Sequence, residues 1–183
     1  MTGDAWNIPN SLTLLRILLI PVFVGLMLYA RYDSALAVLL GAGLTDALDG
    51  TIARASNQRT RLGMYLDPLA DKLLLTTGFL TLSVLHLVPL WMVILVVSRD
   101  AILLAGAVLA HLTDSDVDIA PTLLGKGTTV VQLTYLLLAV GCAAWQMDLR
   151  LLDPLLYLVV VLTVASGFHY LYRGFARLNV GQV

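Results

Sequence analysis

Residues 45–72 read TDALDGTIARASNQRTRLGMYLDPLADK and place four aspartates between long apolar runs. Asp46 and Asp49 are three residues apart, and Asp67 and Asp71 are four residues apart. On an α-helix both spacings put the two side chains on one face. A short polar break separates the pairs. The stretch therefore predicts two adjacent antiparallel helices that bring four carboxylates together.

The chain around this stretch is strongly apolar. It has 183 residues, of which 59% are hydrophobic and 13% are charged, and its mean hydropathy is +0.88. A soluble domain usually carries about 25% charged residues. We therefore expect an all-α polytopic membrane protein with six transmembrane helices, preceded by a short interfacial segment that holds Trp6. The predicted helices, each near the ~20 residues that cross a bilayer, are 10–30, 35–55, 62–85, 88–110, 121–146 and 151–173.

Basic residues near the ends of these segments predict the orientation, because Lys and Arg are enriched in cytoplasmic loops. We expect both termini to be cytoplasmic in a bacterial inner membrane, or matrix-facing if the protein is mitochondrial. We also expect a single membrane domain over residues 1–183. The basic residues on the side of the N-terminus are Arg54, Arg59, Arg61, Lys126, Arg173 and Arg177, against Arg31 and Arg150 on the other side.

Charge and cysteine content exclude several classes of protein. The net charge of −1 argues against a nucleic-acid partner. Cys142 is the single cysteine, which excludes disulfide frameworks and cysteine-rich metal sites. The histidines are too scattered for a ligand set, and no Ser-His-Asp or Cys-His arrangement is evident. We therefore expect direct displacement rather than a covalent intermediate.

Four carboxylates inside a bilayer need a physical explanation. A central Asp costs about 2.5–3.5 kcal/mol on the insertion scale, and four together also repel one another. Two divalent cations would remove both penalties, and hard oxygen ligands suit Mg²⁺ or Mn²⁺. Paired metals of this kind stabilise the attacking and leaving oxygens of a phosphoryl displacement. The alternative is that the aspartates form salt bridges with Arg54, Arg61 or Lys72.

The same residues resemble the CDP-alcohol phosphatidyltransferase signature, D-x2-D-G-x2-A-R-x8-G-x3-D-x3-D. The similarity extends through NIPNSLTLLR at 7–16, VVSRD at 96–100 and GKGTTVVQL at 125–133. The resemblance implies six transmembrane helices, a homodimer and an active site near the cytoplasmic face. The matching residues are Asp46, Asp49, Gly50, Ala53, Arg54, Gly63, Asp67 and Asp71.

The resemblance also implies a role for each aspartate. Asp46, Asp49 and Asp67 would bind the metals, and Asp71 would bind one metal and act as the general base. A carboxylate is a weak base for an alcohol in water, but a neighbouring metal lowers the alcohol's pKa and makes the transfer feasible.

The small and basic residues of the signature would bind the CDP-lipid. Gly50 and Ala53 would let the cytidine lie against one helix, and Gly63 would clear space on the next. Arg54 would hold the diphosphate, because a guanidinium offers a forked set of donors; it also suits a cytoplasmic helix end.

Further nucleotide contacts are implied at Asn10, Thr13 and Thr60. Asn and Ser at a helix start are also good N-caps, so for Asn10 capping is an equal alternative. Arg16 is either an interfacial side chain that reaches the headgroups or part of the polar cavity, and the sequence leaves this open.

The alcohol acceptor depends on cations elsewhere. The similar bacterial phosphatidylglycerophosphate synthases carry a Lys two residues after the position of Lys126 and an Arg eight residues after that of Arg99. Here Thr128 and Ala107 stand at those places. This loss favours the uncharged glycerol head of phosphatidylglycerol over glycerol 3-phosphate as the acceptor of the phosphatidyl group of CDP-diacylglycerol. The same acceptor is used by eukaryotic-type cardiolipin synthases, which VVSRD also resembles. Lys126 and Arg99 remain candidate acceptor contacts.

Two alternatives compete with these assignments. Arg99 and Asp100 lie deep in a predicted helix, where ionisable groups are usually functional, but they can also form a structural pair with each other or with the aspartates. Intramembrane aspartates can also serve ion transport. Transporters usually show internal repeats and longer chains, which makes an ion transporter, like an inactive scaffold, the weaker hypothesis.

Overall fold

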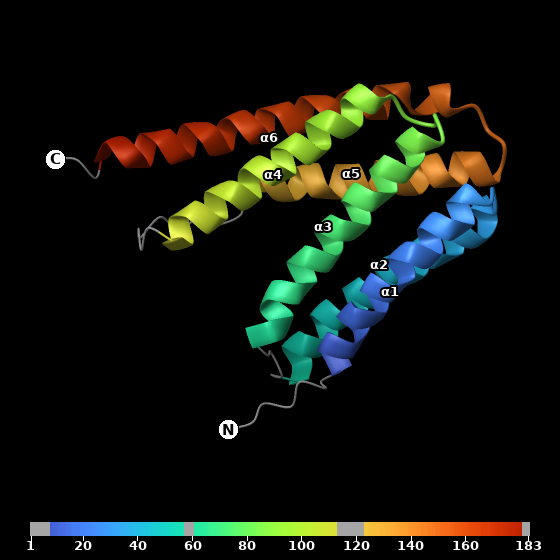
Figure 1. The fold of residues 1–183 in the computed structure, drawn as a ribbon, viewed down its shortest axis with the longest axis horizontal. Coiled ribbons are helices and arrows are strands. Elements are labelled where there is room, and N and C mark those ends of the chain that lie inside the picture. Colours follow the sequence, from blue (N-terminus) through green and yellow to red (C-terminus); the bar gives the residue numbers. More distant parts are fainter. Residues whose placement is uncertain (1–7, 57–60, 113–122, 181–183) are drawn as a thin grey trace. The chain divides into compact units, whose positions relative to one another are not determined.

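The computed structural model describes residues 8–56, 61–112 and 123–180, with side chains for 11–45, 69–106 and 123–172. These residues form helices and no strand, which confirms the all-α class (Figure 1). The helices are α1 (Ile8–Leu28), α2 (Tyr32–Ser56), α3 (Arg61–Val84), α4 (Leu90–Leu112), α5 (Leu123–Ala144) and α6 (Asp153–Val180), with a short 3₁₀ turn at Leu149–Leu152 before α6.

Two helix boundaries differ clearly from the prediction. Helix α2 begins at Tyr32 rather than 35, with Asp33 in its first turn, where a carboxylate interacts well with the helix dipole. Helix α6 continues to Val180 rather than ending at 173. An apolar run marks the part of a helix that suits the bilayer, whereas backbone hydrogen bonds continue through polar residues. The interfacial segment predicted around Trp6 lies outside the described residues.

Three helices end in the same way. After α1, the Arg31 amide donates to the Leu26 carbonyl (2.8 Å) and the Ala30 amide donates to the Met27 carbonyl (3.0 Å). This is the Schellman pattern, in which one residue adopts the left-handed conformation. The same paired bonds close α3 and α5. The left-handed residues are Ala30, His86 and Gln146, with φ of 56°, 56° and 54°.

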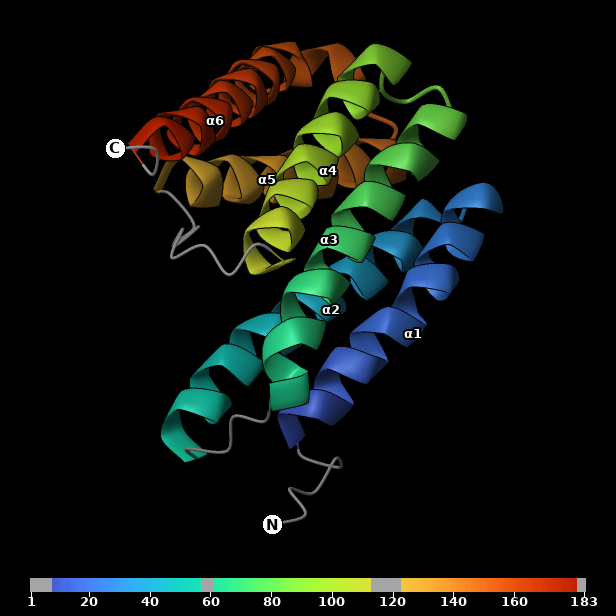
Figure 2. The same ribbon diagram turned by 60° about the vertical axis from the view of Figure 1, so that its left-hand side comes forward.

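The chain forms two compact units. The first comprises Met1–Leu87 and Leu136–Leu149. In it α1 packs against both α2 and α3 (Figure 2). A Cβ added at Gly78 would lie 2.7 Å from Leu136 Cδ2, so α3 closely approaches the second half of α5. Small residues permit such close packing of membrane helices. The core of this unit includes Phe23, Met27, Leu39, Phe79 and Leu82.

The second unit comprises Val88–Tyr135 and Arg150–Val183. In it α4 packs against α6, and the first half of α5 bonds to α6. Gln132 Nε2 donates to Thr163 Oγ1 (3.0 Å), and both side chains are fully buried. The apolar core of this unit includes Met92, Val93, Val96 and Val159.

The distribution of polarity is that of a membrane protein. Many large apolar side chains are exposed, for example Leu18 on α1 and Val161 on α6, while Arg16, Arg99 and Gln132 are buried. Such an arrangement suits a lipid solvent, because polar groups must be satisfied internally there. Within the described part of the chain, three helical stretches are long and apolar enough to cross a membrane: Ser11–Leu28, Leu123–Ala144 and Leu149–Tyr172. Tyr32–Thr45 is a shorter apolar stretch.

Candidate active site

The two aspartate pairs lie at matching levels along α2 and α3, counted in residues from the end of α2 and from the start of α3. Asp46 is ten residues before the end of α2 at Ser56, and Asp71 is ten residues after the start of α3 at Arg61. At 1.5 Å per residue each is about 15 Å along its helix from that end. Both views place the start of α1, the end of α2 and the start of α3 at the same end of the first unit (Figures 1 and 2).

Asp49 and Asp67, the other members of the two pairs, also lie at similar distances along their helices. Asp49 is seven residues before the end of α2, and Asp67 is six residues after the start of α3. Both helices are continuous through these positions. Residues three or four apart on such a helix share a face, which is the condition that the prediction for each pair required. Of the four aspartates, Asp71 is the one whose side chain the structure describes.

Most of the other predicted site residues are located by backbone only. Helix α2 carries Gly50, Ala53 and Arg54, α3 carries Gly63, and α1 carries Asn10, with side chains outside the described set. Thr60 lies wholly outside the described residues. Among the side chains that are described, no three metal-ligating residues lie together. Of the four aspartates, Asp71 is the one that belongs to these described side chains.

Asp71 is bound by an arginine that the sequence analysis did not pair with it. Arg16 Nη1 donates to Asp71 Oδ1 at 2.7 Å, linking α1 to α3. The Arg16 side chain is 1% exposed, whereas that of Asp71 is 45% exposed. Arg16 is therefore not an interfacial residue reaching for the headgroups. The Arg16 side chain lies inside the unit, whereas the Asp71 carboxylate is partly exposed at its surface.

The sequence contained a signal for this contact. Arg16 is a single cation within an apolar helix, and such a group needs an acidic partner or a polar cavity. The salt-bridge alternatives considered for the aspartates involved Arg54, Arg61 and Lys72, which are close in sequence. The actual contact spans 55 residues, and local spacing cannot show it.

The start of α1 presents polar residues at three-residue intervals. Thr13 is fully buried and lies three residues before Arg16, so the two share a face. Asn10 precedes Thr13 by the same interval. Helix α1 begins at Ile8, so Asn10 is its third residue and not its N-cap. The capping alternative for Asn10 is therefore wrong, because the helix starts earlier than predicted.

A second polar cluster lies within the second unit, centred on Arg99. Its Nη1 donates to Asp100 Oδ1 at 2.7 Å, and its Nε and Nη2 donate to Ser166 Oγ at 3.3 and 2.9 Å. Nη2 also donates to the Gly125 carbonyl at 3.4 Å. Arg99 is 5% exposed and Asp100 8%. Of the alternatives for these two residues, the pair with each other is confirmed.

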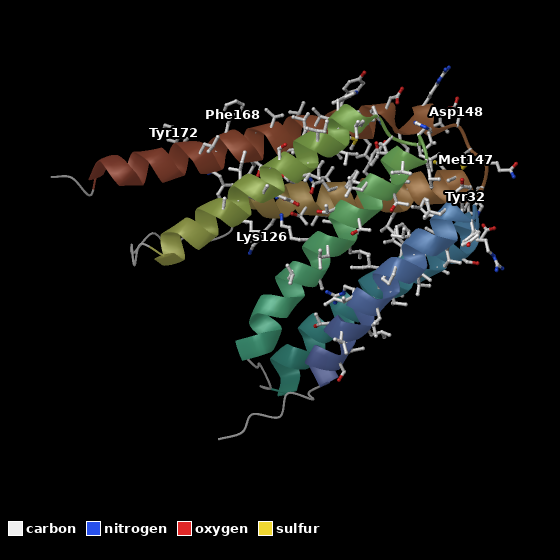
Figure 3. All side chains as sticks on the ribbon, in the orientation of Figure 1. Tyr32, Lys126, Met147, Asp148, Phe168 and Tyr172 are labelled. Carbon is white, nitrogen blue, oxygen red and sulfur yellow. The ribbon has the colours of Figure 1, made fainter. Side chains whose placement is uncertain are left out.

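The two positions compared for the acceptor differ in environment. Lys126 is exposed on the first turn of α5 (Figure 3). Thr128 is fully buried, and its hydroxyl donates to the Leu124 carbonyl at 2.8 Å and to the Leu162 carbonyl of α6 at 3.3 Å. Position 128 thus faces the interior of the second unit, as Arg99 does.

The donor chemistry of the first unit fits divalent cations. Carboxylates are the ligands that Mg²⁺ and Mn²⁺ prefer, and the four aspartates lie at matching levels along α2 and α3, two helices that both pack against α1. The described carboxylate, Asp71, is nearly half exposed. A ligand can therefore reach it without disturbing the core.

Comparison with known proteins identifies relatives of this chain. The family model for CDP-alcohol phosphatidyltransferases matches residues 6–168. A probable cardiolipin synthase (CMP-forming) of Drosophila melanogaster is 35% identical over 181 residues, covering 90% of this chain and 56% of the fly protein. The human cardiolipin synthase (CMP-forming) is 33% identical over 194 residues, covering 97% of this chain and 64% of the human protein.

A bacterial relative matches over its full length. The CDP-diacylglycerol–glycerol-3-phosphate 3-phosphatidyltransferase of Bacillus subtilis is 35% identical over 194 residues, covering 97% of this chain and 100% of that protein. The chain spans less than two thirds of the two animal proteins, at 56% and 64% of their lengths. With the family model covering most of its length, the chain belongs to the CDP-alcohol phosphatidyltransferase family.

Proposed function

We propose that this protein is an integral membrane enzyme that transfers the phosphatidyl group of CDP-diacylglycerol to phosphatidylglycerol, forming cardiolipin and CMP. The observation that carries the proposal is the pair of matched aspartate levels on α2 and α3, inside a chain of this family. The reaction forms a bond between the acceptor oxygen and the phosphatidyl phosphorus and breaks the bond from that phosphorus to CMP. The proton of the hydroxyl passes to the enzyme.

Asp71 is the residue to which we assign that proton. Its carboxylate is partly exposed, and one oxygen is held by the buried Arg16. A general base must reach the proton that it removes while its own orientation is fixed. The exposure of Asp71 lets it reach the proton, and its contact with Arg16 fixes its orientation.

Asp46, Asp49, Asp67 and Asp71 would hold two divalent cations, Mg²⁺ or Mn²⁺. When bound, such ions stabilise charge on the attacking and leaving oxygens. Gly50, Ala53 and Gly63 would leave room for the nucleotide, and Arg54 would bind its phosphates. Asn10, Thr13 and Thr60 complete the proposed nucleotide site. Thr13 lies on the buried face of α1 that also carries Arg16.

The second unit favours an acceptor without a free phosphate. Asp100 balances the charge of Arg99, and Ser166 and Gly125 accept further bonds from the same guanidinium. Position 128, where the phosphatidylglycerophosphate synthases were expected to carry a second Lys, is here a buried neutral Thr. Among the side chains that the structure describes, Arg99 is the cation of this cluster and Asp100 balances it, so the cluster binds a phosphate dianion poorly. The fly and human relatives, which are named as cardiolipin synthases, support the same choice.

Glycerol 3-phosphate is the second candidate acceptor. The Bacillus subtilis relative, which is named for that acceptor, is matched over 100% of its own length, whereas the fly relative is matched over 56%. Lys126 is exposed and could contact either acceptor.

We further propose that all six helices cross the membrane, with both termini on the cytoplasmic or matrix side, and that the protein is a homodimer. Helices α3 and α4 have 24 and 23 residues, which is sufficient to span the hydrocarbon core. The orientation rests on the distribution of Lys and Arg. The dimer rests on the resemblance to the family.

A competition assay tests the acceptor. Purified protein is given labelled CDP-diacylglycerol, Mg²⁺, and equal concentrations of phosphatidylglycerol and glycerol 3-phosphate, and the lipid products are separated. The Asp49→Asn variant is the matched inactive control. Cardiolipin as the main product supports the proposal, whereas phosphatidylglycerophosphate as the main product replaces it with the second candidate.

A further inference from the structure

Arg16 is the largest fully buried side chain among the described residues. It lies within Ser11–Leu28, one of the stretches able to cross a membrane. A guanidinium in such a place is costly and is usually retained for function. Its interaction with Asp71, at 2.7 Å, joins it to the residue that the proposed function makes the general base.

The two partners differ sharply in exposure, and this difference suggests the direction of the effect. Arg16 is fixed by the surrounding core, at 1% exposure, while Asp71 is 45% exposed at the surface of the unit. A buried, planar guanidinium is rigid, whereas a partly exposed carboxylate can rotate. The bond from Nη1 to Oδ1 therefore orients Asp71 more than it orients Arg16.

We propose that Arg16 is a positioning residue for catalysis, holding the Asp71 carboxylate in the orientation that accepts the proton of the alcohol. The inference rests on the proposed role of Asp71. A purely structural role explains the pair less well, because apolar residues of similar volume often stabilise a core as well as a buried ion pair does. The arginine also holds the one described carboxylate of the candidate site.

The variants Arg16→Met and Arg16→Lys test this role. Met keeps much of the buried volume without charge, and Lys keeps the charge without the fork. Phe23→Leu is the matched control, since Phe23 is also fully buried on α1 and is uncharged. Loss of a residue that orients a ligand or base typically costs about 10–100-fold. We expect a loss of that size in kcat for Arg16→Met, with KM for CDP-diacylglycerol within about twofold of wild type.

Two further results separate positioning from packing. Arg16→Lys should recover part of the lost kcat, and Phe23→Leu should keep kcat even where it lowers the melting temperature. Binding of Mn²⁺, followed by electron paramagnetic resonance without lipid substrate, should weaken in Arg16→Met. If Arg16 only lay near the metal without orienting Asp71, its positive charge would repel Mn²⁺, and removing that charge would tighten binding. Tighter Mn²⁺ binding in Arg16→Met therefore overturns the proposal. If Arg16→Met does not fold, Arg16→Lys is judged by the same kcat, KM and Mn²⁺ criteria.

A double-mutant comparison distinguishes this inference from the proposed function. If Arg16 acts through Asp71, adding Arg16→Met to Asp71→Asn costs little more than Asp71→Asn alone. Independent, multiplied losses overturn the inference. A nearly inactive Asp71→Asn beside a fully active Arg16→Met also overturns it but leaves the proposed function standing. A fully active Asp71→Asn removes the proposed role of Asp71 and the inference with it.

Discussion

The buried Arg99 cluster predicts a large and specific loss of stability when the arginine is removed. In Arg99→Met, Asp100 loses the cation bonded to it at 2.7 Å, while both positions stay buried. Removing one partner of a buried ion pair costs about 3–5 kcal/mol. For a chain of 183 residues, each kcal/mol shifts the melting temperature by about 2–4 °C. We therefore expect a fall of roughly 6–20 °C.

The neighbouring residues provide graded controls. Ser166→Ala removes the hydroxyl that accepts two bonds from Arg99, and a hydrogen bond to a charged group is worth about 1.5–3 kcal/mol. We expect a smaller fall, of about 3–12 °C. Arg99→Met combined with Asp100→Leu should regain much of the loss, because no buried charge is left without its counterion. Exposed Arg31→Met should change the melting temperature by less than about 2 °C.

The assay is thermal unfolding of detergent-purified protein, followed by the loss of the monodisperse peak on size exclusion after heating. The KM for the acceptor is measured on the same samples below their melting temperatures. If Arg99→Met melts within about 2 °C of wild type but raises that KM tenfold or more, Arg99 is an acceptor contact. The structural explanation of the cluster would then be wrong.

Three further predictions concern the site and the packing around it. EDTA should abolish transfer and Mg²⁺ or Mn²⁺ should restore it, because four carboxylates are proposed to share these ions; full turnover in chelator would contradict the metal assignment. Asp71→Asn should lower kcat by about 10²–10⁴-fold while CDP-diacylglycerol still binds, and retention of more than about a tenth of kcat would exclude a general base. Gly78→Ala should destabilise the first unit by about 1–3 kcal/mol, since its Cβ would lie 2.7 Å from buried Leu136; Gly141→Ala, whose Cβ meets Trp145 at 3.7 Å, should be nearly neutral in the same melting assay.

The helices were predictable because an apolar stretch marks at least part of each one and polar residues separate these stretches. The prediction erred at the ends. Hydropathy follows the solvent that surrounds a helix, whereas a helix ends where its hydrogen bonds end, which is why α6 continues to Val180. The capping alternative for Asn10 was wrong for the same reason, since α1 already begins at Ile8.

Contacts between distant residues could not be read from local spacing. The pairing of Arg16 with Asp71 spans 55 residues, and that of Arg99 with Ser166 spans 67. The sequence showed that each arginine lay in an apolar helix and needed a partner, but the identity of that partner depends on which helices pack together. The metal ligands, the nucleotide contacts and the acceptor remain predictions from the motif and from the proposed chemistry.

The most direct test of the central claim is the release of CMP from CDP-diacylglycerol by the purified protein in Mg²⁺ with phosphatidylglycerol. We predict that one CMP forms for each cardiolipin. We also predict that a folded Asp46→Asn, Asp49→Asn double variant releases almost none. The proposed function is wrong if folded wild type releases no CMP with either phosphatidylglycerol or glycerol 3-phosphate, or if the double variant matches the wild-type rate.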